Sequence, residues 1–294
     1  MKIIVLLAFY LVASSHQVAM ACSSCGSGAV DPIILFPNEN HKLYLGINQQ
    51  SRIRDVSSTG DIKNTAGIQE KQVTTVSAAS RILRSQGFIS LTGSFVTNSS
   101  SEYSSMGYGD PLLALRYNIL NQSFTKPLVP QIQIITSHKF ARNSSIHEST
   151  DPELLDIYGS GFHETSFGGD LWFGMLPIKF GASLLYTLTH KDVKSEINID
   201  PGDRWTLIST LGYIHKNDFK LIGGWIASES YKLKTGGNSI SRSEKSSRSW
   251  YLTAETLSQE FLNYRITLSE QGPWQGQNSS SYASVTFAIM KGFL

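Results

Sequence analysis

The segment Tyr282-Ala-Ser-Val-Thr-Phe-Ala-Ile-Met-Lys-Gly-Phe-Leu294 carries the clearest fold signal in the sequence. Its residues alternate between an apolar set and a mostly small or polar set: Ala283, Val285, Phe287 and Ile289 against Tyr282, Ser284, Thr286 and Ala288. A period of two with one apolar face is typical of a β-strand that lies between lipid and a wet interior. Bacterial outer-membrane barrels usually end on such a strand, because it pairs with the first strand and closes the sheet.

The same strand-like pattern recurs upstream, in segments about as long as a tilted strand needs to cross a bilayer. The sequence therefore predicts a closed antiparallel transmembrane β-barrel of about twelve strands, an all-β fold. The predicted strands cover residues 42–54, 71–83, 88–97, 110–120, 131–139, 164–175, 179–189, 204–214, 220–231, 249–257, 262–269 and 282–294.

Long and short connections alternate between these segments. The long, polar ones span 57–70, 98–108, 141–163, 191–203, 234–248 and 270–280, and the others are short except for 121–130. Long loops outside the cell and short turns in the periplasm are typical of outer-membrane barrels, which places both termini in the periplasm. A soluble lipocalin-like or sandwich protein shares the period of two, but it would bury its apolar faces.

Composition agrees with a barrel in which only every second residue meets lipid. Hydrophobic residues make up 40% and charged residues 16% of the 294 residues, below the roughly 45–50% and 25% of soluble domains. The mature chain has no apolar segment as long as the roughly 18–20 residues of a spanning helix. A net charge of +2 gives no electrostatic argument for a nucleic-acid partner.

The first residues read as an export signal. Lys2, the apolar run 3–13 and the small-residue site Ala19-Met20-Ala21 predict a signal peptide over residues 1–21. A periplasmic tail over 22–41 and the barrel over 42–294 would follow. The predicted location is the bacterial outer membrane, with lipid and a small solute as partners.

Cys22 and Cys25 form a Cys-x-x-Cys pair in the predicted tail. Three interpretations stay open: lipidation of Cys22, a metal or redox pair that serves a periplasmic partner, or a local disulfide or idle thiols. Gly26 stands where a c-type haem site needs His, and no cofactor is predicted.

Charged residues on the polar faces of the predicted strands should face the lumen, because Arg or Lys facing lipid at mid-bilayer costs about 2–4 kcal/mol. They would either fill a narrow barrel with ion pairs or line a pore and set its charge selectivity. These lumen candidates are Arg81, Arg116, Lys139, Asp170, Lys179, Arg204, Glu255 and Arg265.

The segment Tyr108-Gly-Asp-Pro-Leu-Leu-Ala-Leu-Arg-Tyr117 resembles a strand opening of the outer-membrane transporters grouped with the meta-pathway of phenol degradation. The tail sequence Cys22-Ser-Ser-Cys-Gly-Ser-Gly28, followed by Asp31-Pro32, resembles an N-terminal signature of exported barrels. The resemblance implies a non-enzymatic channel for passive passage of small solutes, hydrophobic or aromatic ones included. Two alternatives remain: a barrel that anchors the Cys-x-x-Cys segment, and an outer-membrane hydrolase, for which no Gly-x-Ser-x-Gly motif is present.

Overall fold

The computed structural model describes residues 39–63, 68–82, 86–120, 129–142, 148–175, 177–194, 197–215, 219–256 and 262–294. No helix in these ranges is both long enough and apolar enough to cross a lipid bilayer.

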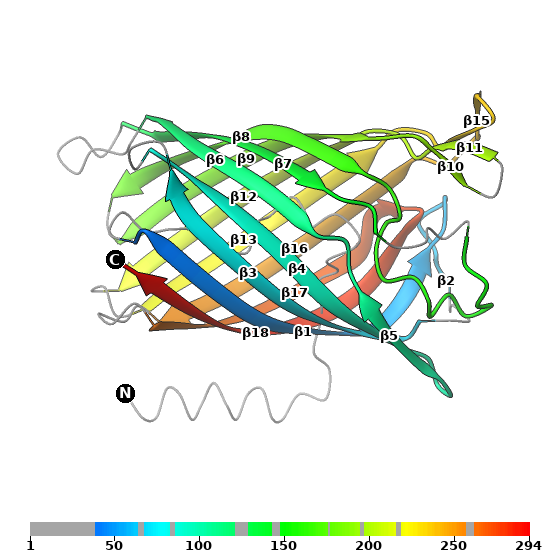
Figure 1. Cartoon of the computed structure of the whole chain (residues 1–294), viewed down its shortest axis with the longest axis horizontal. Coiled ribbons are helices and arrows are strands. Elements are labelled where there is room, and N and C mark those ends of the chain that lie inside the picture. The colour runs from blue at the N-terminus through cyan, green and yellow to red at the C-terminus, as the bar shows by residue number, and fades with distance from the viewer. Residues whose placement is uncertain are drawn as a thin grey trace.

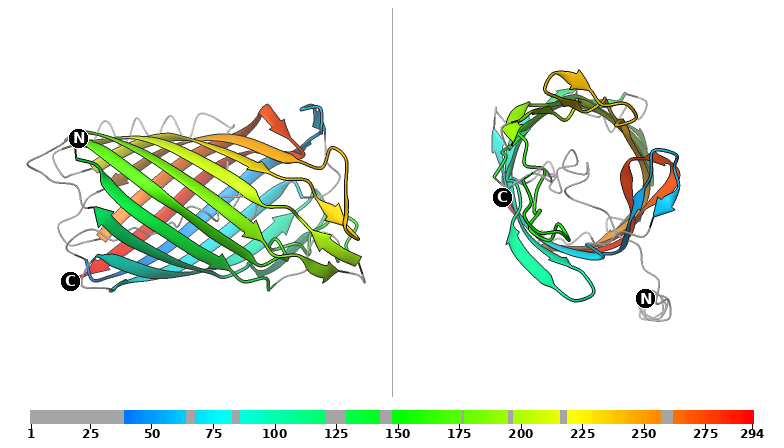
Figure 2. Two further views of the ribbon diagram at one scale, coloured as in Figure 1. Left: turned by 90° about the horizontal axis from the view of Figure 1, so that it is seen from above. Right: turned by 90° about the vertical axis from the view of Figure 1, so that its right-hand side faces the viewer.

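Twelve antiparallel strands close into a barrel, as the sequence predicts (Figure 1). Each strand pairs with its neighbours in the chain, and the last strand pairs with the first. The view along the axis in Figure 2 shows the strands as a ring. The barrel strands are β1 (His41–Val56), β3 (Glu70–Ile82), β4 (Gly87–Ser99), β6 (Leu112–Leu120), β7 (Gln131–Lys139), β8 (Glu164–Met175), β9 (Ile178–Thr189), β12 (Arg204–His215), β13 (Phe219–Ser230), β16 (Lys245–Thr256), β17 (Leu262–Gln277) and β18 (Ser279–Phe293).

The closing pair β1–β18 runs from His41 opposite Phe293 to Val56 opposite Ser279, with one irregularity between Ser51 and Arg54. Because β1 begins where β18 ends, both strands meet one rim of the barrel, which we call the terminal rim. The opposite rim, on the right in Figure 1, carries the long connections. We call it the loop rim.

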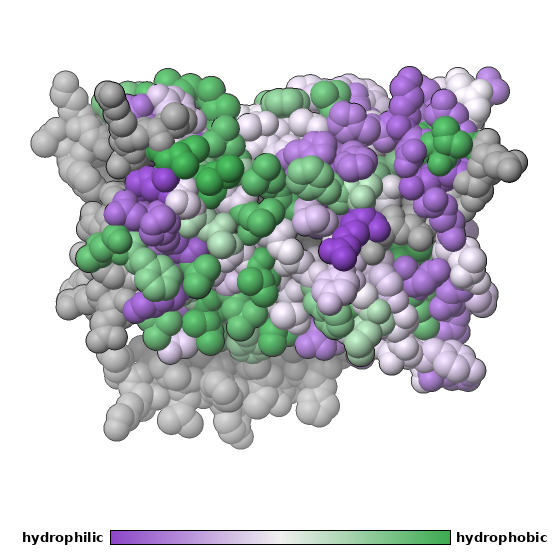
Figure 3. Space-filling model, in the orientation of Figure 1, coloured by the Kyte–Doolittle hydropathy of each residue, from purple (hydrophilic) through white to green (hydrophobic). Residues whose placement is uncertain are grey.

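Side chains alternate between the two faces of the barrel wall as the period of two predicts. Leu184 and Phe287 point outward and are 51% and 53% exposed, whereas Arg116 and Asp170 point inward and are 5% and 6% exposed. Apolar side chains gather on the outer surface over the strands, and hydrophilic ones are dense at the loop rim (Figure 3). An apolar exterior around a charged interior is the arrangement of a barrel that spans a membrane.

Several segments that the sequence predicts as loops contain β-strands. The predicted loop 270–280 is instead the tip of a long hairpin, because β17 reaches Gln277 and β18 begins at Ser279. Asn278 turns this hairpin with a φ of +48°, a left-handed conformation that Asn tolerates. The remaining short strands are β2 (Ile62–Lys63), β5 (Ser104–Tyr108), which pairs with β4, and a separate sheet of β10 (Asp192–Lys194), β11 (Ile197–Asp200), β14 (Lys234–Thr235) and β15 (Asn238–Ser239).

The predicted signal peptide, Cys22 and Cys25 lie outside the described residues. Their roles, and the division of the chain at residues 21 and 41, therefore remain predictions.

The outward position of Leu184, in the middle of β9, gives a test of the lipid-facing surface. We expect Leu184→Arg to lower the free energy of unfolding by about 2–4 kcal/mol, because the guanidinium would face the hydrocarbon core. Urea unfolding of the protein in lipid vesicles measures this difference. Ser183→Lys is the matched control on the lumen face, and an equal loss in both variants would contradict the assigned faces.

Candidate lumen site and its constriction

Near the loop rim, one carboxylate joins two cations from three strands. Glu164, the first residue of β8, accepts hydrogen bonds from Lys139 at the end of β7 and from Arg204 at the start of β12. Arg204 Nη2 lies 2.9 Å from Glu164 Oε2. We call these three residues the outer trio. All sit at strand ends of the same rim, so the strand order alone brings them together.

Near the terminal rim a second group repeats this arrangement. Glu255 on β16 pairs with Lys220 on β13 and with Arg265 on β17, each at 2.8 Å. The Glu255 side chain is almost fully buried. We call Lys220, Glu255 and Arg265 the inner trio. Both trios hold two cations for each carboxylate.

Between the two trios lies a buried one-to-one pair. Arg116 on β6 donates through Nη1 to Asp170 Oδ2 on β8 at 2.7 Å and to Gln133 Oε1 on β7 at 3.3 Å. Gln133 in turn donates to Asn118 at 2.7 Å. The Nε atom of Arg116 has no hydrogen-bond acceptor among the described residues, so hydrogen bonds satisfy this buried cation only in part.

The two remaining sequence candidates, Arg81 and Lys179, join neither trio. Arg81 Nε donates to the backbone oxygen of Glu39 at 2.7 Å, and Lys42 pairs with the Glu39 carboxylate at 2.8 Å. The sequence candidates leave out other charged residues that face the lumen, among them Lys42, Lys71, Glu164 and Lys220. Each shares the parity of inward-facing neighbours on its strand, which is the signal that could have found them.

The lumen encloses a cavity of about 390 Å³. One wall is apolar: Ile135, Leu185 and Ile208 form a buried cluster, and Ile226 and Tyr251 pack against it. These side chains come from β7, β9, β12, β13 and β16. Gly168 on β8 makes room for Leu185, because a Cβ there would lie 2.7 Å from Leu185 Cδ2 and 2.0 Å from the backbone oxygen of Leu184.

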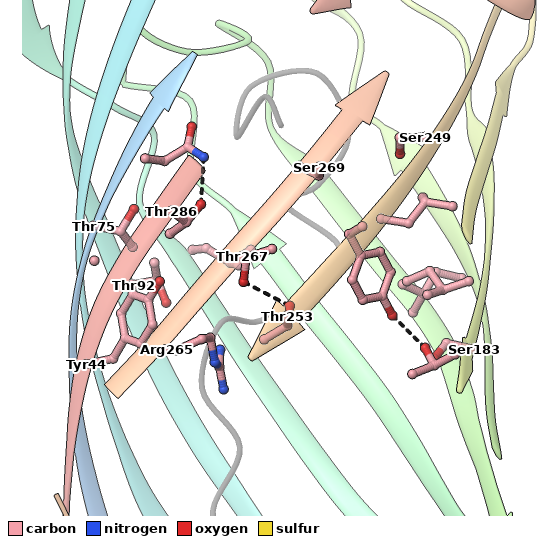
Figure 4. A pocket seen from close by; sticks show the side chains of 18 of the residues that line it. Tyr44, Thr75, Thr92, Ser183, Ser249, Thr253, Arg265, Thr267, Ser269 and Thr286 are labelled. Atoms are coloured by element: carbon pink, nitrogen blue, oxygen red, sulfur yellow. Dashed lines mark hydrogen bonds between the residues drawn. The ribbon is translucent and has the colours of Figure 1, made fainter. Parts of the chain in front are cut away.

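The opposite wall, on β1, β3, β4, β17 and β18, is lined by hydroxyl and amide groups (Figure 4). These groups bond to one another. Asn48 donates to Thr286 at 2.7 Å, and the Thr267 hydroxyl lies 2.9 Å from that of Thr253 on β16. Hydroxyls paired in this way present a polar, uncharged surface, next to which Arg265 of β17 adds a cation.

The connection between β7 and β8 narrows the lumen. In the right-hand view of Figure 2 its green trace lies inside the ring of strands, and Tyr158, Gly159 and Ser160 line the cavity. Asn98 on β4 donates to the backbone oxygens of Leu155 and Ile157, each at 2.9 Å. We call residues 148–163 the inner loop.

Asp110 fastens the inner loop to the barrel wall. Its carboxylate accepts hydrogen bonds from the backbone nitrogens of Ser160 at 2.7 Å and Arg142 at 3.0 Å. The preceding Gly109 allows close approach to β4, since a Cβ there would lie 2.1 Å from Ser94 Oγ. The Gly-Asp step of the segment 108–117 thus has a structural role that the sequence alone does not show.

Among the described residues, no group of three or more His, Cys, Asp or Glu side chains has the geometry to hold a metal ion.

Fold and lumen together define a twelve-stranded transmembrane β-barrel with a charged, hollow interior. The structure is similar to that of the COG4313 outer membrane channel from Pseudomonas putida F1, with a TM-score of 0.67 and 11% identity over 90% of this chain and 100% of that one. It also matches the KdgM porin, with a TM-score of 0.47, 9% identity and coverage of 86% and 99%. The match to the CymD monoaromatic hydrocarbon channel has a TM-score of 0.46, 9% identity and coverage of 94% and 99%.

No family model and no curated protein matches the sequence. The likeness to the first structure therefore shows the fold alone.

The buried Arg116–Asp170 pair gives a stability test. We expect Arg116→Met to destabilise the barrel by about 3–5 kcal/mol, because it leaves the Asp170 carboxylate buried without its cation. Urea unfolding in detergent micelles measures the loss. The double variant Arg116→Gln, Asp170→Asn removes both charges and should recover most of it; a double variant as unstable as the single one would contradict this.

The contacts of Asp110 give a test of the inner loop. Asp110→Ala removes the carboxylate that accepts two backbone hydrogen bonds, and a bond to a charged group contributes about 1.5–3 kcal/mol. We expect the state in which the inner loop is detached from the barrel wall to become at least about tenfold more populated. Protease cleavage within residues 148–163 should accelerate accordingly. Asp61→Ala, in an exposed turn, is the control, and equal cleavage rates in both would rule out the anchoring role.

Proposed function

We propose that this protein is a passive channel for small solutes in the bacterial outer membrane, and that it acts by transport and not by catalysis. The observation that supports this best is the cavity of about 390 Å³ inside a closed barrel. Its volume is in the range of pockets that accept small molecules, about 300–1,000 Å³. A barrel of twelve strands is narrower than the 16–18-stranded porins, so side chains meet any solute that passes.

The apolar exterior supports a membrane location, and the strand arrangement supports a sidedness. The terminal rim, where β1 begins and β18 ends, would face the periplasm. The inner loop starts from the loop rim and would meet a solute that enters from outside the cell. Its contacts with Asn98 and Asp110 hold it against the wall, which leaves the cavity beside it open to small solutes only.

The apolar wall supports the view that the solutes include hydrophobic or aromatic ones. Ile135, Leu185 and Ile208 line the cavity with apolar side chains, so an apolar ring that leaves water can contact them there. The hydroxyl wall opposite can accept or donate hydrogen bonds to polar substituents of the same solute.

Conductance of the purified protein in planar lipid bilayers tests the channel function. We expect discrete single-channel steps in potassium chloride, smaller than those of a 16-stranded porin because the lumen is narrower. Asp170→Asn should change the step size, because Asp170 lines the cavity, whereas Asp61→Asn outside the lumen should not. A correctly folded barrel without conductance would show that it is plugged, and the proposal would then fail.

A further inference from the structure

The described residues that line the lumen include more cations than carboxylates. The cavity is lined by the cations Arg116, Lys139, Lys220 and Arg265, and by the carboxylates Asp110 and Asp170. Asp170 is bonded to Arg116, and Asp110 accepts a backbone hydrogen bond from Ser160 of the inner loop. Among the described lining residues, cations therefore outnumber carboxylates at the surface that a solute meets.

The two trios explain how this positive charge is kept in a stable barrel. Glu164 holds Lys139 and Arg204, and Glu255 holds Lys220 and Arg265. Each trio has one negative and two positive charges, so each keeps a formal charge of +1. The carboxylate offsets the repulsion between the two cations.

The trios stand at opposite ends of the same passage. Lys139, Glu164 and Arg204 lie at strand ends of the loop rim, and Lys220 and Glu255 lie next to strand ends of the terminal rim. A positive group at each end, with low-dielectric walls between, raises the local concentration of anions along the passage. The apolar cluster of Ile135, Leu185 and Ile208 lies on the wall of the same cavity.

We propose that the channel selects small organic anions, in particular carboxylates that carry an apolar body about the size of one ring. The two trios attract the carboxylate, and the apolar wall takes up the body. This inference rests on the proposed channel function and names the class of solute. An inorganic anion would use the charges but not the apolar wall, and a neutral hydrocarbon would use the wall but not the charges.

Reversal potentials across planar bilayers that contain the full-length protein test the charge preference. In a potassium chloride gradient we expect chloride to permeate at least about sevenfold better than potassium, because a lumen potential of about one kT acts on the two ions with opposite sign. In bi-ionic gradients, benzoate should permeate better than acetate despite its larger size. Benzyltrimethylammonium, with a similar ring and the opposite charge, should permeate least.

Lys139→Gln and Lys220→Gln, combined, remove one cation from each trio. The barrel should still fold, because Glu164 keeps Arg204 and Glu255 keeps Arg265. We expect the ratio of chloride to potassium permeability to fall at least about twofold. Lys63→Gln is the matched control, since it removes a positive charge from exposed β2 outside the lumen, and it should leave the ratio unchanged.

Ile208→Thr tests the apolar wall. We expect it to lower the ratio of benzoate to acetate permeability about three- to fivefold, through lost apolar contact, and to leave the chloride-to-potassium ratio unchanged. Conductance without anion preference, or acetate permeating better than benzoate, would overturn the inference and leave the channel function standing. Absence of any current in every salt would overturn the channel function itself.

Discussion

The pairing of β18 with β1 closes the barrel, and the other features of the fold follow from this closure. In a bilayer no water is present to satisfy an unpaired backbone N–H or C=O group, and each such group costs several kcal/mol. A sheet avoids this cost only if it has no edge. The register from His41 opposite Phe293 to Val56 opposite Ser279 removes both edges at once. The alternation of faces follows, because closure separates an outside from an inside.

Closure of the barrel also brings charged side chains together in its interior, where their burial costs free energy unless they are paired. Charged side chains cannot face lipid, so they turn inward, where several of them are buried away from water. The structure compensates for this burial by pairing side chains of opposite charge. Arg116 and Asp170 offset each other one to one, whereas Glu164 and Glu255 each hold two cations. Ion pairs therefore stabilise the lumen while the formal charge of these groups stays positive. The same residues can serve both stability and selectivity.

The inner loop narrows the passage through the barrel because side chains of the wall hold it inside the lumen. A loop buried in a lumen brings backbone groups that need partners. Asn98 supplies donors to the oxygens of Leu155 and Ile157, and Asp110 supplies an acceptor for Ser160. These polar side chains stand in for water, which is why the loop can lie inside the ring. The constriction depends on the wall residues as much as on the loop itself.

The twelve strands and the direction of their side chains could be predicted from the residues alone, because both follow from a local period of two. Phe287 and Arg116 could be assigned to opposite faces from their neighbours alone. Which charges meet could not be predicted in this way, since Arg116 and Asp170 are 54 residues apart and come together through the register of β6, β7 and β8. The inner loop was equally out of reach: residues 141–163 read as a polar external connection. Its inward course depends on Asn98 and Asp110, which no local pattern connects to it.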